Sequence, residues 1–132
     1  MYRILLCDDE PHILRAAEFK LSRSGFEVLL ACDGEEAWSM MQTVRPDLLV
    51  TDCQMPRLDG IGLAERMGAN AQLSSIPVIM LTAKGFELSA DELRSRYGIH
   101  AVIAKPFSPK NLAIQAAEVI ALSQAEAAAS SN

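Results

Sequence analysis

The chain has no basic stripe or cluster. Its 12 lysines and arginines are outnumbered by 17 aspartates and glutamates, which gives a formal net charge of -5 at pH 7. Proteins that bind the phosphates of nucleic acid usually gather lysines and arginines on one face. Here these residues are scattered singly along the sequence, so we expect no direct contact with nucleic acid.

The chain also lacks a long apolar run near its start. The apolar stretch Ile4 to Cys7 meets three acids, Asp8, Asp9 and Glu10, within a few residues. A signal sequence or a membrane span needs a longer stretch than this. We therefore expect no contact with a membrane and, by default, a cytoplasmic location.

Cysteines are few, and their spacing does not pair them. The chain has three, Cys7, Cys32 and Cys53, an odd number without the close spacing of a metal-binding motif. Cys7 and Cys53 adjoin acidic residues, but small buried thiols are common at the ends of strands. We expect all three cysteines to stay reduced.

The chain does have enough apolar material for one domain. Half of its 132 residues are hydrophobic, which suffices for one well-buried core and not for two. Apolar, strand-like runs alternate five times with helix-like stretches, and the runs lack in-and-out alternation. Strands buried on both faces have this pattern, so the sequence predicts an α/β fold with a parallel sheet between layers of helices.

Proline and capping residues mark the first two predicted helices. The first should run from Pro11, which suits a first helical turn, to Ser24. Asp33 with Glu36 resembles a capping box and opens the second helix. That helix should include Val44 and be closed by Pro46.

Similar signals mark the remaining helices. They are predicted from Asp59-Gly60 to Met67, from Ser89 to about Tyr97-Gly98, and from Ser108-Pro109 onward. The last helix should bury Leu112, Ala116, Val119 and Ile120 and then dissolve into a small, polar tail. We therefore divide the chain into one domain, residues 1–124, and a flexible tail or linker stub, residues 125–132.

Acidic, hydroxyl and basic residues follow four of the predicted strands. Asp8, Asp9 and Glu10 follow the first, Asp52 the third, Thr82 the fourth and Lys105 the fifth. The carboxyl ends of parallel strands meet at one edge of an open α/β sheet, where ligands bind. Three carboxylates, a hydroxyl and a lysine in one crevice suit Mg²⁺ and a phosphoryl group.

The same residues predict a phosphotransfer reaction. An aspartate can attack phosphorus and form an acyl phosphate when cations neutralise the transferring oxygens. Asp52 is the predicted nucleophile, because it is the lone acid at the end of the central strand. Lys105 should pair with one phosphoryl oxygen, and Thr82 should donate a hydrogen bond to another. Three close carboxylates repel without a cation, so Mg²⁺ should stabilise the fold.

With these residues in place, the chain resembles the receiver domains of response regulators in two-component signalling. The resemblance covers about Arg3 to Leu122 and rests on four segments in order, each at a predicted strand end. They are Asp8-Asp9-Glu10, Asp52-Cys53-Gln54-Met55-Pro56 with Gly60, Leu81-Thr82-Ala83, and Lys105-Pro106-Phe107. Each segment is common alone, and the four together are highly specific.

The resemblance implies a fold and a set of roles. It implies a doubly wound, flavodoxin-like sheet of five parallel strands in the order 2-1-3-4-5. Asp9, Asp52 and the backbone carbonyl of Gln54 would hold Mg²⁺ directly, and Asp8 would act on it through water. Asp52 would take phosphate from a sensor histidine kinase or a phosphotransfer protein. A cis peptide bond before Pro106 is also implied.

By the same resemblance the protein is a signalling switch and not an enzyme, apart from its self-catalysed phosphotransfer and dephosphorylation. Gln54 and Lys84 would face the water that hydrolyses the acyl phosphate. A downstream effector protein or domain would read the phosphorylated state. A homodimer through the face of the fourth and fifth helices is left open.

The chain departs from the family at Val102. Receivers often carry an aromatic residue there, whose ring turns inward when the threonine moves. Valine has few rotamers and no ring to swing. Thr82 and the loop 83–86 would then carry the change alone, or Tyr97 or Phe86 would substitute.

Two other functions fit the same architecture. A phosphatase that passes through an aspartyl phosphate usually needs a second acid, and Gln54 stands where that acid would sit. A flavin-binding module needs a phosphate-cradling loop after the first strand, where Asp8, Asp9 and Glu10 would repel phosphate. Turnover of phosphoesters and the colour of the protein separate these alternatives. Glu10 itself is predicted only to favour the positive end of the first helix.

Overall fold

The structure is a computed structural model, and it describes residues 1–83, 86 and 88–130. Lys84, which the family resemblance assigns to the attacking water, lies outside the described residues. Within the described part, no helix is long and apolar enough to cross a membrane.

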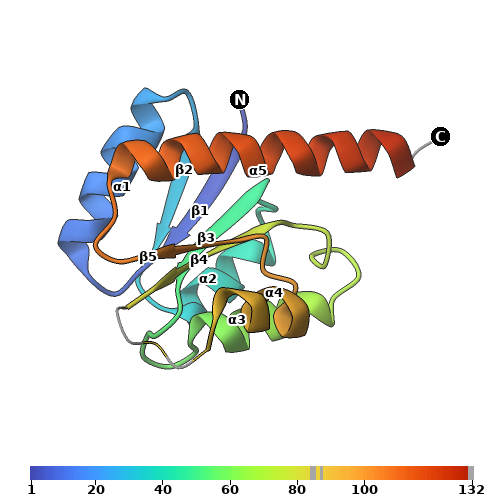
Figure 1. Cartoon of the computed structure of the whole chain (residues 1–132), viewed down its shortest axis with the longest axis horizontal. Helices are drawn as coiled ribbons and strands as arrows, with labels where there is room; N and C mark the ends of the chain where they lie inside the picture. The colour runs from blue at the N-terminus through green and yellow to red at the C-terminus, as the bar shows by residue number, and fades with distance from the viewer. Residues whose placement is uncertain (84–85, 87, 131–132) are drawn as a thin grey trace.

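A parallel sheet lies at the centre of the described part of the chain (Figure 1). Its five strands are β1 (Arg3–Cys7), β2 (Glu27–Ala31), β3 (Leu48–Asp52), β4 (Val78–Thr82) and β5 (Ala101–Ala104). Their order is β2-β1-β3-β4-β5, which confirms the predicted topology. The central strands β3 and β4 are buried along their whole length, whereas the edge strands β2 and β5 are partly exposed.

Helices cover both faces of this sheet (Figure 1). On one face lie α1 (Pro11–Arg23) and α5 (Pro109–Ser130), and on the other lie α2 (Gly34–Met41), α3 (Gly60–Gly68) and α4 (Ala90–Tyr97). Ile4 and Leu6 of β1 pack into the core under α1 and α5, while Leu5 and Cys7 pack under the other three helices. Successive strand residues thus meet two apolar layers, which explains the missing alternation in the sequence.

The register of the strands brings their carboxyl ends to one edge of the sheet. Asp52, the last residue of β3, lies opposite Leu81 of β4. Thr82, the last residue of β4, lies opposite Ala104 of β5. The polar residues that follow these strands therefore share one edge, as expected for a doubly wound sheet.

The capping signal at α4 is confirmed in full. The hydroxyl of Ser89 accepts a hydrogen bond from the backbone N–H of Glu92 (3.1 Å), and the carboxylate of Glu92 accepts one from the backbone N–H of Ser89 (3.4 Å). Gly98 ends the helix in the left-handed conformation, with φ of 69°. Glycine adopts this conformation without steric cost.

The second helix begins as predicted and ends earlier. Asp33 caps it by accepting from the N–H of Glu36 (2.8 Å), but the Glu36 carboxylate accepts from the N–H of Cys32 (3.3 Å), one residue before the reciprocal partner of a capping box. The helix ends at Met41, so its predicted extension through Val44 to Pro46 is wrong. The backbone N–H of Gln42 and of Thr43 each bond to a carbonyl three residues back, which tightens the last turn and ends the helix.

The last helix also differs from its prediction. Leu112, Ala116, Val119 and Ile120 are buried, as expected. The helix does not dissolve at Ala125, however, and α5 continues to Ser130. Alanine has the highest helix propensity, so an alanine-rich segment can stay helical while its side chains are exposed. The division of the chain at residue 124 stays a prediction.

Candidate functional site

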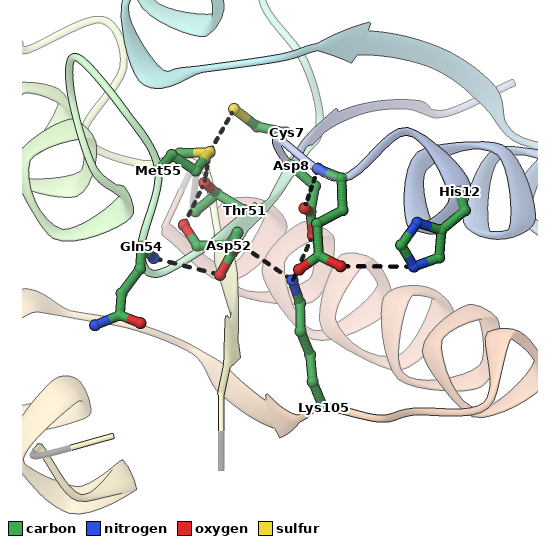
Figure 2. Close-up of polar contacts among 9 residues, drawn as sticks. Cys7, Asp8, His12, Thr51, Asp52, Gln54, Met55 and Lys105 are labelled. Carbon is green, nitrogen blue, oxygen red and sulfur yellow. Dashed lines mark hydrogen bonds and ion pairs between the residues drawn. The ribbon is translucent and has the colours of Figure 1, made fainter. Parts of the chain in front are cut away.

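Asp8, Asp52 and Lys105, which the sequence predicts at three strand ends, converge on one small site (Figure 2). Ligand oxygens of Asp8, Asp9, Glu10 and Asp52 all lie within 4.8 Å of one another. The ammonium group of Lys105, which follows β5, reaches into this group (Figure 2). The topology has thus brought together residues nearly 100 positions apart in sequence.

Lys105 contacts three of the four acids. Its Nζ lies 2.8 Å from Asp8 Oδ2, 3.0 Å from Asp52 Oδ2 and 3.4 Å from Glu10 Oε1. Asp8 is fully buried and Asp52 is 5% exposed, so these charges interact with little screening by water. One cation thus faces three anions, and the cluster carries excess negative charge.

Burial and the neighbouring charges shift the pKa of two groups in this cluster. Burial raises the pKa of Asp52 above its usual value, Lys105 opposes that rise, and the nearby carboxylate of Asp8 adds to it. Burial alone would lower the pKa of Lys105, but its contacts with Asp8 and Asp52 outweigh burial and raise it. Lys105 therefore stays charged, while ionised Asp52 lacks full compensation.

Asp8 provides a test of whether a cation fits this cluster. Within the described part of the chain, its buried Oδ2 has no hydrogen-bond partner, although it forms the 2.8 Å ion pair with Lys105. The ammonium group of Lys105 therefore compensates part of the charge on this oxygen, and an ionised carboxylate oxygen can accept a further ligand beside it. A buried carboxylate oxygen in this state is rare unless it has a functional role. Together with Asp9 and Asp52, it fits a hard divalent cation.

The other predicted site residues lie at the same edge. The backbone N–H of Gln54 donates to Asp52 Oδ1 (3.3 Å), while the Gln54 side chain points away from Asp52 (Figure 2). Thr82 is buried at the end of β4, and its carbonyl accepts a hydrogen bond from the backbone N–H of Lys105 (2.7 Å). The peptide bond between Lys105 and Pro106 is cis, as expected.

A sulfur-containing layer lies beneath the acids. Cys7 Sγ lies 3.3 Å from Met55 Sδ, which in turn faces the hydroxyl of Thr51 (Figure 2). Burial raises the pKa of the Cys7 and Cys53 thiols to about 12, so neither is a reactive thiolate at neutral pH. All three cysteines are free, in agreement with the prediction that they stay reduced.

A cleft of about 510 Å³ opens beside the acids between α1 and the start of α5. Glu10 and Lys105 line it at the site, and Ile13, Ala16 and Phe107 supply apolar surface. Of the four clustered acids, Glu10 lines this cleft.

Glu10 lies in the acidic cluster, as expected from its place after the first strand, although the sequence prediction gave it no ligand role. Its carboxylate belongs to the acidic cluster, contacts Lys105 and lies 3.5 Å from Nε2 of His12. The prediction assigned Glu10 only to the end of the first helix. The available signal was its place as the third consecutive acid after β1.

The fold and this edge define a flavodoxin-like α/β protein with an acidic ligand site at the carboxyl ends of its strands. The sequence profile of the response regulator receiver domain matches residues 4–117. The chain therefore belongs to the response regulator receiver domain family.

Individual relatives agree with this assignment. The transcriptional regulatory protein PhoP for alkaline phosphatase synthesis from Bacillus subtilis is 38% identical over 83% of this chain and 45% of its own length. Response regulator Rre1 from Synechocystis is 35% identical over 97% of this chain and 55% of its own length. The chain thus spans about half the length of the curated relatives it matches.

Solved structures share the fold. The receiver domain of the Francisella response regulator 1452 superimposes with a TM-score of 0.82 at 30% sequence identity, over 91% of this chain and 97% of its own. The match covers nearly all of both chains.

Proposed function

We propose that Asp52 accepts a phosphoryl group from a histidine kinase or phosphotransfer protein in a Mg²⁺-dependent reaction, and that this modification switches a partner-binding face. The observation that carries the proposal is the convergence of Lys105 Nζ and the buried Asp8 on Asp52. Membership of the receiver family supports it.

In this reaction an Asp52 carboxylate oxygen would attack phosphorus. The new O–P bond forms as the N–P bond of the phosphohistidine breaks, and the electron pair returns to the imidazole nitrogen of the donor. Lys105 lies within 3.0 Å of an Asp52 oxygen, so its ammonium group would pair with a phosphoryl oxygen bound there. The hydroxyl of Thr82 would donate to another oxygen.

Asp8, Asp9, Asp52 and the carbonyl of Gln54 are the residues that would hold the metal. Bound Mg²⁺ would neutralise charge on the phosphoryl oxygens. Two observations support this assignment. Asp8 Oδ2 is buried without a hydrogen-bond partner, and the acids around Lys105 carry excess negative charge.

The switch would begin at Lys105 and Thr82. Phosphorylation of Asp52 would replace the carboxylate that Lys105 now contacts, and Thr82 is coupled to Lys105 by the hydrogen bond between their backbones. Val102, which stands where receivers often carry an aromatic residue, is partly buried on β5. Phe86 and Tyr97 also pack on the edge of the core, so a rearrangement there could still move an aromatic ring.

The output is proposed to come through an effector protein or domain, and the relatives named above include a transcriptional regulator. Contact with DNA would then belong to the effector and not to this acidic domain. Cytoplasmic location and the open question of a homodimer stay predictions.

A signalling role is favoured over turnover of small phosphoesters. The residue two positions after Asp52 is Gln54, and its side chain points away from the nucleophile (Figure 2). It therefore offers no acid to protonate a leaving group. The flavin alternative is disfavoured because the acids after β1 would repel a ligand phosphate.

The test is intact mass after incubation with acetyl phosphate, with and without Mg²⁺. We expect one phosphoryl group to be added only with Mg²⁺, and none in Asp52→Ala. Asp91→Asn is the matched control, because the side chain of Asp91 is 96% exposed on α4 and should not affect the reaction. An adduct that persists in Asp52→Ala, or none in the wild-type protein, would contradict the proposal.

A further inference from the structure

A contact between α2 and the loop after Asp52 stands out because it leaves no room for a side chain. A Cβ atom built on Gly34, the first residue of α2, would overlap the carbonyl oxygen of Leu58 and approach Leu58 C and Cβ to 2.8 Å each. Gly34 does not have a positive φ, so its backbone conformation does not require glycine. The close approach to Leu58 is what excludes a larger residue.

Leu58 belongs to the short loop that joins β3 to α3 and carries Gln54. The backbone N–H of Gly34 donates to the Leu58 carbonyl (3.1 Å), and Nε of Arg57 lies 3.7 Å from Asp33 Oδ2. Arg57 has a φ of 68°, a conformation that residues with a side chain rarely adopt unless their surroundings impose it. The start of α2 therefore helps to hold this loop in its observed shape.

The same segment is tied to the other half of the site. The thiol of Cys7 lies 3.3 Å from the Asp33 carbonyl, and Cys7 directly precedes Asp8. A chain of contacts thus runs from the end of β1 through Asp33 and Gly34 to Leu58. It links the strand that carries Asp8 and Asp9 to the loop that follows Asp52.

We propose that Gly34 is a positioning residue, which sets the spacing between the loop after Asp52 and the acids after β1. Any side chain at residue 34 would push the Leu58 carbonyl away and shift the loop that carries Gln54. Metal binding and phosphorylation would then weaken, although Gly34 touches neither ligand. This inference rests on the proposed function.

The test compares Gly34→Ala with Gly68→Ala. Gly68 also lies in a helix, and a Cβ atom built there meets nothing within 4 Å, so its substitution controls for the change in helix propensity. For each variant, the rate of phosphorylation by acetyl phosphate is measured over a range of Mg²⁺ concentrations. Circular dichroism and melting without Mg²⁺ report on folding.

We expect Gly34→Ala to need about tenfold more Mg²⁺ for half-maximal rate. Substitution of residues that hold metal ligands in place typically lowers metal affinity by about 10- to 100-fold, and tenfold is the lower end of that range. Gly68→Ala should match the wild-type protein. Equal Mg²⁺ requirements in folded Gly34→Ala and Gly68→Ala would overturn the inference, because a purely structural role for Gly34 would change melting alone. A wild-type protein that gains no phosphoryl group would instead overturn the proposed function, and this inference with it.

A second pair of variants covers the case in which Gly34→Ala does not fold. Glycine at residue 57 adopts a positive φ without strain, so Arg57→Gly should let the loop move away from an added methyl group. The double variant Gly34→Ala/Arg57→Gly is then compared with Arg57→Gly alone. A raised Mg²⁺ requirement in the double variant supports the inference, and an unchanged one overturns it.

Discussion

At the scale of single residues, Asp52 combines reactivity with a cost to stability. Its carboxylate is buried beside Asp8, and both effects raise its pKa even though Lys105 opposes them. The folded protein without metal thus disfavours the charged form, which is the form that the proposed reaction needs. A site arranged for function is often less stable than its neutral variant.

We therefore expect Asp52→Asn to be more stable than the wild-type protein when no divalent metal is present. Asparagine keeps the shape of the side chain and removes its charge, leaving Lys105 paired with Asp8. The melting temperature in EDTA at neutral pH should rise by roughly 3–5 °C, the change that about 1 kcal/mol produces in a domain of this size.

Asp91→Asn again serves as the control, since it removes the charge of an exposed aspartate. It should leave the melting temperature nearly unchanged. If Asp52→Asn melts at or below the temperature of the wild-type protein, Lys105 fully compensates the charge of the Asp52 carboxylate.

The charged residues of the candidate site were easier to predict from the sequence than the residues that hold them in place. Asp8, Asp9, Asp52 and Lys105 follow apolar runs, and the topology of a parallel sheet requires strand ends to meet. Gly34 could not be found in this way. Its importance depends on how closely α2 approaches Leu58, and that distance is set by tertiary packing between segments far apart in the sequence.

At the scale of elements, α4 is less firmly held than α1. Leu93 is the buried residue of α4, whereas α1 buries Leu14, Ala17 and Leu21. The stability of α4 therefore depends more on its ends, where Ser89 and Glu92 form the capping box. This places a weakly packed helix close in sequence to Thr82, where the proposed switch would act.

Hydrogen exchange should reveal this difference. We expect the amides of residues 90–97 to exchange faster than those of residues 11–23 in the wild-type protein. Ser89→Ala removes the cap, which is worth about 1 kcal/mol, and should speed local opening of α4 by about fivefold. Ser95→Ala, a change on an exposed position of the same helix, should have a much smaller effect. Uniform exchange across both helices would show that α4 opens only with the whole domain.

Elements were predicted best where a local signal decided them. The box of Ser89 with Glu92 and the turn at Gly98 fix α4 through contacts between near neighbours. The predicted C-terminal ends of α2 and α5 were wrong, because competing local preferences are nearly balanced at both ends. The last turn of α2 tightens at Gln42 and Thr43, and alanine propensity carries α5 beyond its last buried residue.

At the scale of the whole molecule, the doubly wound sheet gathers negative charge at one edge. The chain carries a net charge of -5, and four acidic side chains meet where β1 and β3 end, with Lys105 as the partner of three of them. The apolar core on both faces of the sheet holds this edge together against that repulsion. A cation that binds at this edge would therefore raise the free energy of unfolding of the whole domain.

This linkage predicts that Mg²⁺ stabilises the fold. A cation that binds the folded site and not the unfolded chain contributes about 2.7 kcal/mol when its free concentration is 100 times its Kd. The melting temperature should therefore rise by several degrees as MgCl₂ is added, and EDTA should reverse the rise. NaCl at equal ionic strength separates site binding from general screening, which acts over about 10 Å at 0.1 M salt.

The rise should be smaller in Asp52→Asn, because that variant lacks one of the ligands and begins with less repulsion. An equal rise with NaCl, or none with MgCl₂, would mean that the charges of Asp8 and the neighbouring acids are compensated without a bound metal.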